Sequence, residues 1–158
     1  MKTYILTLIL TFSLSLNETL ASTSGNDVPA AVSSSLTSKY QGAEVNSWKI
    51  VDNICLVQFS LGREDYEAAF DRDGSWIRTG KIIKFGQLPA NVTKAFKESE
   101  YASWNKEKVS KVEFSGFGDM PLYEIKVENP ANNYSLFYND EGLIVMKVHN
   151  MQLRVAKN

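Results

Sequence analysis

Side chains that could perform catalysis are sparse in this sequence. It holds one histidine, His149, and one cysteine, Cys55. Nucleophilic catalysis needs a base beside the nucleophile, and metal catalysis needs clustered ligands. No cysteine, second histidine or acidic cluster lies near His149 in the chain. We therefore expect His149 to be a surface or edge residue, and we expect no catalytic residue, no cofactor and no metal site.

An acidic segment, Asp71-Arg72-Asp73-Gly74, was compared with a calcium-binding loop. In an EF-hand register with Gly74 at position six, Ala69 falls at position one and Gly80 at position twelve. Both positions require a carboxylate in such a loop. Asp and Gly also favour a tight reversal of the chain, so we interpret the segment as a hairpin turn. Weak calcium binding at this turn is the alternative.

Composition limits the partners that the chain can have. Cys55 lies in the apolar run Ile54-Cys55-Leu56-Val57, which predicts a buried strand and an unreactive thiol. The formal net charge is −1, and both signs are scattered along the chain. Nucleic acids and anionic membranes require a basic stripe, so we expect neither as a partner.

The N-terminus has the layout of a secretory signal peptide. Lys2 is followed by an apolar run from Tyr4 to Leu16 and by small residues that end at Ala21. A membrane span needs roughly 20 apolar residues, and this run is shorter. We predict that residues 1–21 are a signal peptide cleaved after Ala21. The protein would then act in the periplasm or outside the cell, with no membrane span after cleavage.

The rest of the chain contains one pattern twice. Val28-Pro29-Ala30-Ala31-Val32, with Leu36 and Tyr40, matches Leu88-Pro89-Ala90-Asn91-Val92, with Phe96 and Tyr101. Further on, Tyr66, Phe70, Asp71, Asp73 and Gly74 match Tyr134, Tyr138, Asn139, Glu141 and Gly142 at the same spacings. We predict a short linker at 22–27, a first repeat at 28–87, a second repeat at 88–150 and a C-terminal tail at 151–158.

Each copy reads first as a helix and then as four strands. Pro29 and Pro89 suit a first helical turn, because the missing N–H would have no partner there. Alternating residues in 44–51 and 54–61 flank Asp52-Asn53, which predicts a hairpin. The predicted fold class is α+β. Two tandem helix-plus-four-strand repeats form a largely antiparallel sheet of about eight strands with both helices on one face.

Alternation along the strands assigns side chains to the two faces of this sheet. Residues predicted to face the helices are Trp48, Ile50, Cys55, Val57, Phe59, Tyr123, Ile125, Val127, Ile144, Met146 and Val148. Glu124, Lys126 and Glu128 are predicted to point outward into water. Several outward positions are apolar, which often marks an interaction site. The candidate partner-binding residues are Val51, Ile54, Leu56, Ile77, Phe137, Leu143 and Val145, with Val45 beside them. The alternative is that a loop, the tail at 150–158 or a crossed arrangement of the elements covers them.

The repeated motifs resemble those of the PepSY-like proteins of bacterial envelopes, which are similar in fold to beta-lactamase inhibitory protein. The resemblance rests on the Pro-Ala motif that opens each copy and on the Tyr, Phe or Tyr, and Asp-x-Asp-Gly pattern that closes it. The second turn, Asn139-Asp140-Glu141-Gly142, departs from that pattern. The resemblance implies tandem units whose open sheet face holds a protein partner, and it implies no enzymatic activity.

These observations favour an exported, non-catalytic protein-binding module. Since similar domains restrain or accompany envelope enzymes, the resemblance implies an inhibitor or regulator of an envelope or secreted enzyme such as a peptidase. Two alternatives stay open: a structural or assembly factor of the cell envelope, and a small-ligand binder.

Overall fold

The computed structural model describes residues 28–118 and 120–150. The predicted signal peptide at 1–21, the linker at 22–27 and the tail at 151–158 lie outside the described residues. The elements occur in the order helix, four strands, helix, four strands. They are α1 (Ala30–Lys39), β1 (Glu44–Val51), β2 (Ile54–Leu61), β3 (Glu64–Asp71), β4 (Trp76–Ile82), the 3₁₀ turn η1 (Phe85–Gln87), α2 (Ala90–Lys97), β5 (Asn105–Phe114), β6 (Leu122–Glu128), β7 (Asn133–Tyr138) and β8 (Ile144–His149).

The eight strands form a single sheet in the order of the sequence, from β1 at one edge to β8 at the other. Each strand pairs antiparallel with the next one along the chain. This confirms the α+β class, the antiparallel eight-stranded sheet and the two helices.

Both helices begin directly after a proline, as expected. The carbonyl oxygen of Pro29 accepts a hydrogen bond of 2.8 Å from the N–H of Ser33, and that of Pro89 accepts one of 3.0 Å from Thr93. Each helix buries two apolar residues spaced by one turn, which places them on one face. The buried residues are Val32 and Leu36 in α1, and Val92 and Phe96 in α2.

The first hairpin confirms the expected two-residue turn. Asp52 and Asn53 have φ values of 49° and 69°, and Val51 lies opposite Ile54. Two consecutive left-handed residues are what a type I′ turn requires, and Asp and Asn tolerate this conformation better than most side chains. The turn therefore sets the register that places Ile50 beside Cys55 on the helix side.

Each helix packs on its own four strands, and strand register places both helices on the same face of the sheet. Beneath α1 the buried residues are Cys55, Val57, Phe59, Ala68 and Phe70. Beneath α2 they are Val109, Ile125, Val127, Leu136 and Tyr138, joined by Leu88 and Tyr101. Cys55 is buried, as expected, and this burial raises the pKa of its thiol.

Two β-bulges place three residues on the face opposite to the one predicted. Strict alternation would place Val45 on the open face, but a register shift between Val45 and Ser47 pairs it with Phe59 on the helix side. A second shift in the β7–β8 pair sets Met146 opposite Phe137, so Met146 and Val148 lie on the open face instead of the core face. A bulge inserts one residue, which reverses the alternation beyond it.

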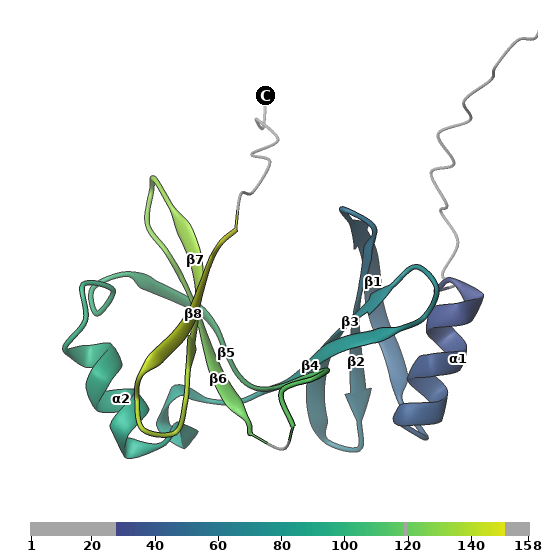
Figure 1. Cartoon of the computed structure of the whole chain (residues 1–158), viewed down its shortest axis with the longest axis horizontal. Coiled ribbons are helices and arrows are strands. Elements are labelled where there is room, and N and C mark those ends of the chain that lie inside the picture. The colour runs from purple at the N-terminus through teal and green to yellow at the C-terminus, as the bar shows by residue number, and fades with distance from the viewer. Residues whose placement is uncertain (1–27, 119, 151–158) are drawn as a thin grey trace, which may run out of the picture.

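The sheet is strongly bent. In Figure 1 the strands of the first half, β1–β3, and those of the second half, β6–β8, rise on either side of β4 and β5. Both helices lie on the outer, convex side. The other face of the sheet therefore lines the inside of the bend, and we call it the concave face.

Candidate functional site

Charged side chains gather at the middle of the concave face. We call this set the central charged cluster: Glu67 on β3, Arg78 on β4, Lys108 and Ser110 on β5, and Glu124 and Lys126 on β6. Strand pairing places all of them on the face opposite the helices. The cluster therefore joins the two halves of the sheet across their boundary.

Glu67 and Glu124 are each held by several donors. Arg78 contacts both, with Nη2 at 3.3 Å from Glu67 Oε1 and Nη1 at 3.4 Å from Glu124 Oε2. Lys108 Nζ lies 2.7 Å from Glu67 Oε2, and Lys126 Nζ lies 3.8 Å from Glu67 Oε1. The hydroxyl of Ser110 donates to Glu124 Oε2 at 3.1 Å. Among the residues that the structure describes, Arg78 is thus the one group with an ion pair to both carboxylates.

Gly80 lies on the concave face next to the central charged cluster. It pairs with Glu67 on one side and with Val112 on the other, so it occupies the concave face between β3 and β5. Because glycine carries no side chain, this position leaves space on the concave face beside Ser110 and Val112. A Cβ at position 80 would lie 3.3 Å from the Ser110 side chain, so even alanine would fit tightly.

The cluster is largely removed from water. The Glu124 side chain is 1% exposed and that of Glu67 is 10% exposed. Burial by itself would raise the pKa of Glu67, but Lys108, Lys126 and Arg78 outweigh it and lower that pKa to about 2. Burial also lowers the pKa of Lys108, and the charge of Glu67 opposes this effect. Glu124 was expected to point outward into water, and it does point outward, but it is buried.

Glu67 should make stability depend on acid pH. Its pKa falls from an ordinary 4.5 to about 2 on folding, so its contribution is complete above pH 4.5 and is lost as the pH falls toward 2. A shift of this size corresponds to about 3 kcal/mol. Urea unfolding at pH 6, 4 and 2.5 should show a smaller loss of stability for Glu67→Gln than for the unaltered protein. Equal losses of unfolding free energy in the two proteins would contradict the lowered pKa of Glu67.

A separate apolar cluster lies beside these charges on the concave face. Its buried members are Val112, Leu122 and Phe137, with Phe114 and Met146 packed against them. The rings of Phe114 and Phe137 meet edge to face with centroids 5.5 Å apart. Phe117, from the loop after β5, extends this contact and is 55% exposed. The open face therefore carries a small core of its own.

The residues proposed from sequence as a binding surface are only partly brought together. Val51, Ile54 and Leu56 lie on the concave face of β1 and β2, as expected. Phe137 lies on the same face but is 3% exposed within the apolar cluster. The others do not join them: Ile77 and Val145 fall at β-bulges, and Leu143 lies in the turn before β8.

Placing a charge at two of these positions should have unequal effects. Phe137→Asp puts a carboxylate into a packed cluster and should cost about 3 kcal/mol or more of unfolding free energy. Leu56→Asp changes a half-buried residue in the first half and should cost clearly less. Chemical denaturation of both variants measures the difference. Equal losses would show that the first half of the concave face is as closely packed as the second.

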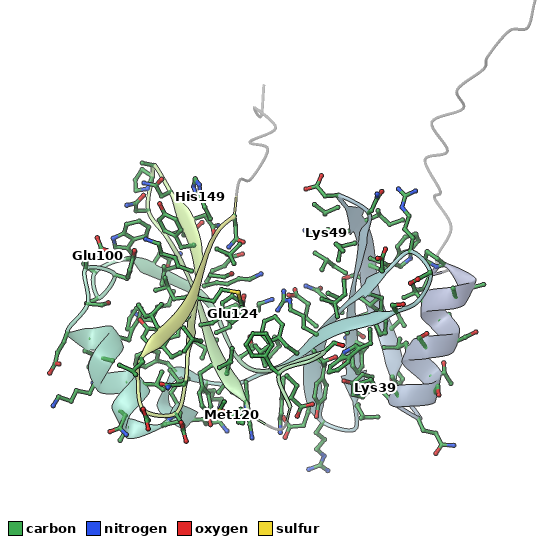
Figure 2. All side chains as sticks on the ribbon, viewed as in Figure 1. Lys39, Lys49, Glu100, Met120, Glu124 and His149 are labelled. Carbon is green, nitrogen blue, oxygen red and sulfur yellow. The ribbon has the colours of Figure 1, made fainter. Side chains whose placement is uncertain are left out.

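The acidic turn and the histidine show no arrangement for chemistry. Asp71 and Asp73 accept hydrogen bonds within their own turn, from the N–H groups of Arg72 at 2.6 Å and Ser75 at 2.8 Å. His149, labelled in Figure 2, is exposed at the end of the edge strand β8, beside the Tyr134 ring. Across residues 28–118 and 120–150, no group of three or more His, Cys, Asp or Glu side chains is placed to hold a metal ion.

Two open hollows lie in the second half, apart from the central charged cluster. One has a volume of about 620 Å³ and is lined by Ser103, Trp104, Asn105, Glu128, Asn129 and Pro130. The other, of about 550 Å³, lies beside α2 and η1 and includes Lys94 and Lys97. Neither hollow contains a residue of the central charged cluster.

The sequence between residues 53 and 146 matches the family described as "Putative beta-lactamase-inhibitor-like, PepSY-like". The chain belongs to the PepSY-like family. The match spans more than half of the chain and includes every residue of the central charged cluster. No curated protein matches the sequence.

Solved structures from Bacteroides species share the PepSY-like fold. A DUF2874 family protein from Bacteroides ovatus is 26% identical with a TM-score of 0.61, over 79% of this chain and 89% of that one. A BLIP-like protein from Bacteroides fragilis is 21% identical with a TM-score of 0.60, over 82% and 93%. A protein from Bacteroides eggerthii described as a "putative periplasmic" protein is 21% identical with a TM-score of 0.62, over 78% and 89%.

These findings place the chain in an inhibitor-like family, and they identify no specific target. One structural relative carries a periplasmic description. Among the residues that the structure describes, neither helix has the length and apolar character needed to cross a membrane.

Of the site residues, sequence reasoning missed the central charged cluster. Its members were separated along the chain, and their alternation with core residues indicated a solvated face. The available signal was Gly80, a glycine inside a strand pattern, which often marks a close approach of other groups.

Proposed function

We propose that this PepSY-like chain is a non-catalytic module that binds a protein partner with its concave face. The observation that supports this most directly is the central charged cluster, which lies in the middle of that face and is flanked by apolar side chains. Aromatic residues and arginine are enriched in protein interfaces, and this face carries Phe114, Phe117 and Arg78.

Stability alone gives a weak reason for such a cluster. Removing charges from water is costly, and replacing a buried ion pair with apolar residues of similar volume is often neutral or stabilising. Two carboxylates and three cations on the concave face therefore favour a role in recognition. The adjoining rings of Phe114 and Phe117 supply apolar surface for the same partner.

We further propose that the chain consists of two tandem units, residues 28–87 and 88–150, which share this face. Two observations support the duplication. The order of one helix and four strands occurs twice. In addition, Gly74 and Gly142 both have φ of 87° and both approach the carbonyl oxygen of the second residue of a helix, Ala31 or Asn91, in the same way.

The function that fits best is inhibition or regulation of an envelope or secreted enzyme such as a peptidase. It draws on the inhibitor-like family, the periplasmic description of one structural relative and the predicted signal peptide at 1–21. The second candidate is a structural or assembly role in the envelope. In that role the same concave face would bind the partner. The two hollows would favour a small-ligand role only if their residues bound a ligand.

Photo-cross-linking in the source cell tests whether the concave face binds a protein. A photoreactive amino acid at Val51 probes this face, and the same residue at Ile50 is a matched control. These neighbours lie on one edge strand, point to opposite faces and are 44% and 42% exposed. We expect position 51 to give a cross-linked product that contains a partner protein. We expect position 50 to give no product of the same mass. Identical products from both positions would contradict the proposal.

A single enzyme in the cross-linked product would favour the regulatory role. A membrane assembly complex would favour the structural role.

A further inference from the structure

The charges of the central charged cluster do not balance. Arg78, Lys108 and Lys126 are positive, whereas only Glu67 and Glu124 are negative. Counting only the residues that the structure describes, the cluster therefore carries one positive charge in excess, in a place that is mostly shielded from water. Partly buried charge is costly unless it is paired, so a further negative group would complete the cluster.

The cations are the part of the cluster that an incoming molecule meets. The side chains of Arg78, Lys108 and Lys126 are 17%, 17% and 21% exposed, whereas those of Glu67 and Glu124 are 10% and 1% exposed. The carboxylates thus lie deeper than the amine groups. A partner that approaches this face encounters N–H donors first.

Of the three cations, Lys126 is the one least engaged with the two carboxylates. Its Nζ lies 3.8 Å from Glu67, which is beyond hydrogen-bond distance, and this is its one ion pair within residues 28–118 and 120–150. It also lies directly opposite Lys108 in the β5–β6 pair. Like charges at such a position repel each other, and one carboxylate between them would relieve the repulsion.

A cationic partner group fits this surface less well. The only acceptor of the cluster without a hydrogen-bond partner among the described residues is Glu124 Oε1, and this atom is buried. A lysine or arginine from outside would have to pass Arg78 and displace it before reaching that oxygen. The accessible groups are donors, so they select an acceptor.

We propose that the concave face recognises its partner through an acidic side chain, whose carboxylate binds Lys108 and Lys126 while the neighbouring apolar residues of the partner pack on Phe114 and Phe117. This inference rests on the proposed function, because it assumes that the concave face is the binding surface. The occupant is an aspartate or glutamate on a protruding loop of another protein. A charge-assisted pair at this position gives specificity as well as affinity.

Phage-displayed, disulfide-constrained loops of random sequence, selected on the immobilised protein, provide the test. Hydrogen exchange then identifies the loops that protect the concave strands. We expect these loops to contain Asp or Glu. Replacing that acid with its amide should weaken binding about tenfold or more, as should Lys126→Met in the protein. Binding should also weaken between 50 and 500 mM salt, since charge pairs are screened.

Lys111→Met is the matched control. Lys111 lies on β5 with Lys108 but faces the helix side and is exposed, so its loss should leave loop binding unchanged. The amide substitution in the loop leaves the protein intact, so it separates recognition from any folding defect of the Lys126 variant.

Concave-face loops that lack acidic residues, or that bind Lys126→Met as tightly as the unaltered protein, would overturn this inference and leave the proposed function standing. Loops that protect only other surfaces would overturn both.

Discussion

Replacing Arg78 with methionine is expected to lower the free energy of unfolding by about 3–5 kcal/mol. Within residues 28–118 and 120–150, Arg78 is the one cation with an ion pair to both Glu67 and Glu124. Methionine keeps much of the side-chain volume but removes the 3.4 Å ion pair to Glu124, whose side chain is 1% exposed. A buried carboxylate that loses its counter-charge destabilises the folded state by far more than a surface pair does.

A second substitution should recover most of this loss. In the double variant Arg78→Met, Glu124→Leu, the buried negative charge is gone, and Glu67 keeps Lys108 at 2.7 Å. Stability should return to within about 1 kcal/mol of the unaltered protein, because apolar replacement of a whole buried pair is often neutral. Urea unfolding of the two single variants and the double variant gives the coupling energy directly.

Lys81 supplies the control for this experiment. It lies on the same strand as Arg78, and its ion pair with Glu64, at 3.2 Å, joins side chains that are 38% and 51% exposed. Lys81→Met should therefore cost less than about 1 kcal/mol. If Arg78→Met were as mild as Lys81→Met, the central charged cluster would not be a buried network. If the double variant were no more stable than Arg78→Met, the loss would arise from packing.

Local sequence signals were enough to predict the elements of this fold. Asp52-Asn53 defined the first hairpin because those residue types accept the left-handed conformation that the turn requires. Pro29 and Pro89 marked the helix starts because a proline removes an N–H that has no partner there. Both signals act within a few residues, so they can be interpreted without knowing the tertiary structure.

The candidate site depends on features that such signals do not contain. The bulges near Val45 and Val145 insert one residue each, and the alternation of polar and apolar residues does not predict them. The ion pair of Lys108 with Glu67 joins β5 to β3 across β4, and Gly80 leaves space beside Ser110, which donates to Glu124. Both are relationships between strands, whereas alternation describes one strand at a time.

Two glycines in turns lie against helix backbone, and they provide the second large prediction. A Cβ on Gly74 would lie 2.6 Å from the carbonyl oxygen of Ala31, and a Cβ on Gly142 would lie 2.6 Å from that of Asn91. Both contacts involve helix backbone, which cannot move aside without disturbing the helix. Both glycines also have φ of 87°, which strains any residue with a side chain.

Gly74→Ala and Gly142→Ala should each lower the unfolding free energy by about 3–4 kcal/mol. Gly116→Ala separates the two causes, since Gly116 also has φ of 87° but a Cβ there would meet nothing within 4 Å. That variant should lose only the backbone strain, about 1–2 kcal/mol. The excess at positions 74 and 142 then measures the contact between turn and helix. Three equal losses would show that the contact contributes nothing.

The same measurements bear on the proposed duplication. If residues 28–87 and 88–150 are two copies of one unit, Gly74 and Gly142 occupy equivalent positions, and their excess losses should agree within about 1 kcal/mol. The surrounding turns differ, because Asp71-Arg72-Asp73 in one unit corresponds to Asn139-Asp140-Glu141 in the other. Agreement despite this difference would mean that the backbone contact itself was retained in both copies. A large loss at one glycine and a small loss at the other would argue that the shared order of elements does not extend to shared packing.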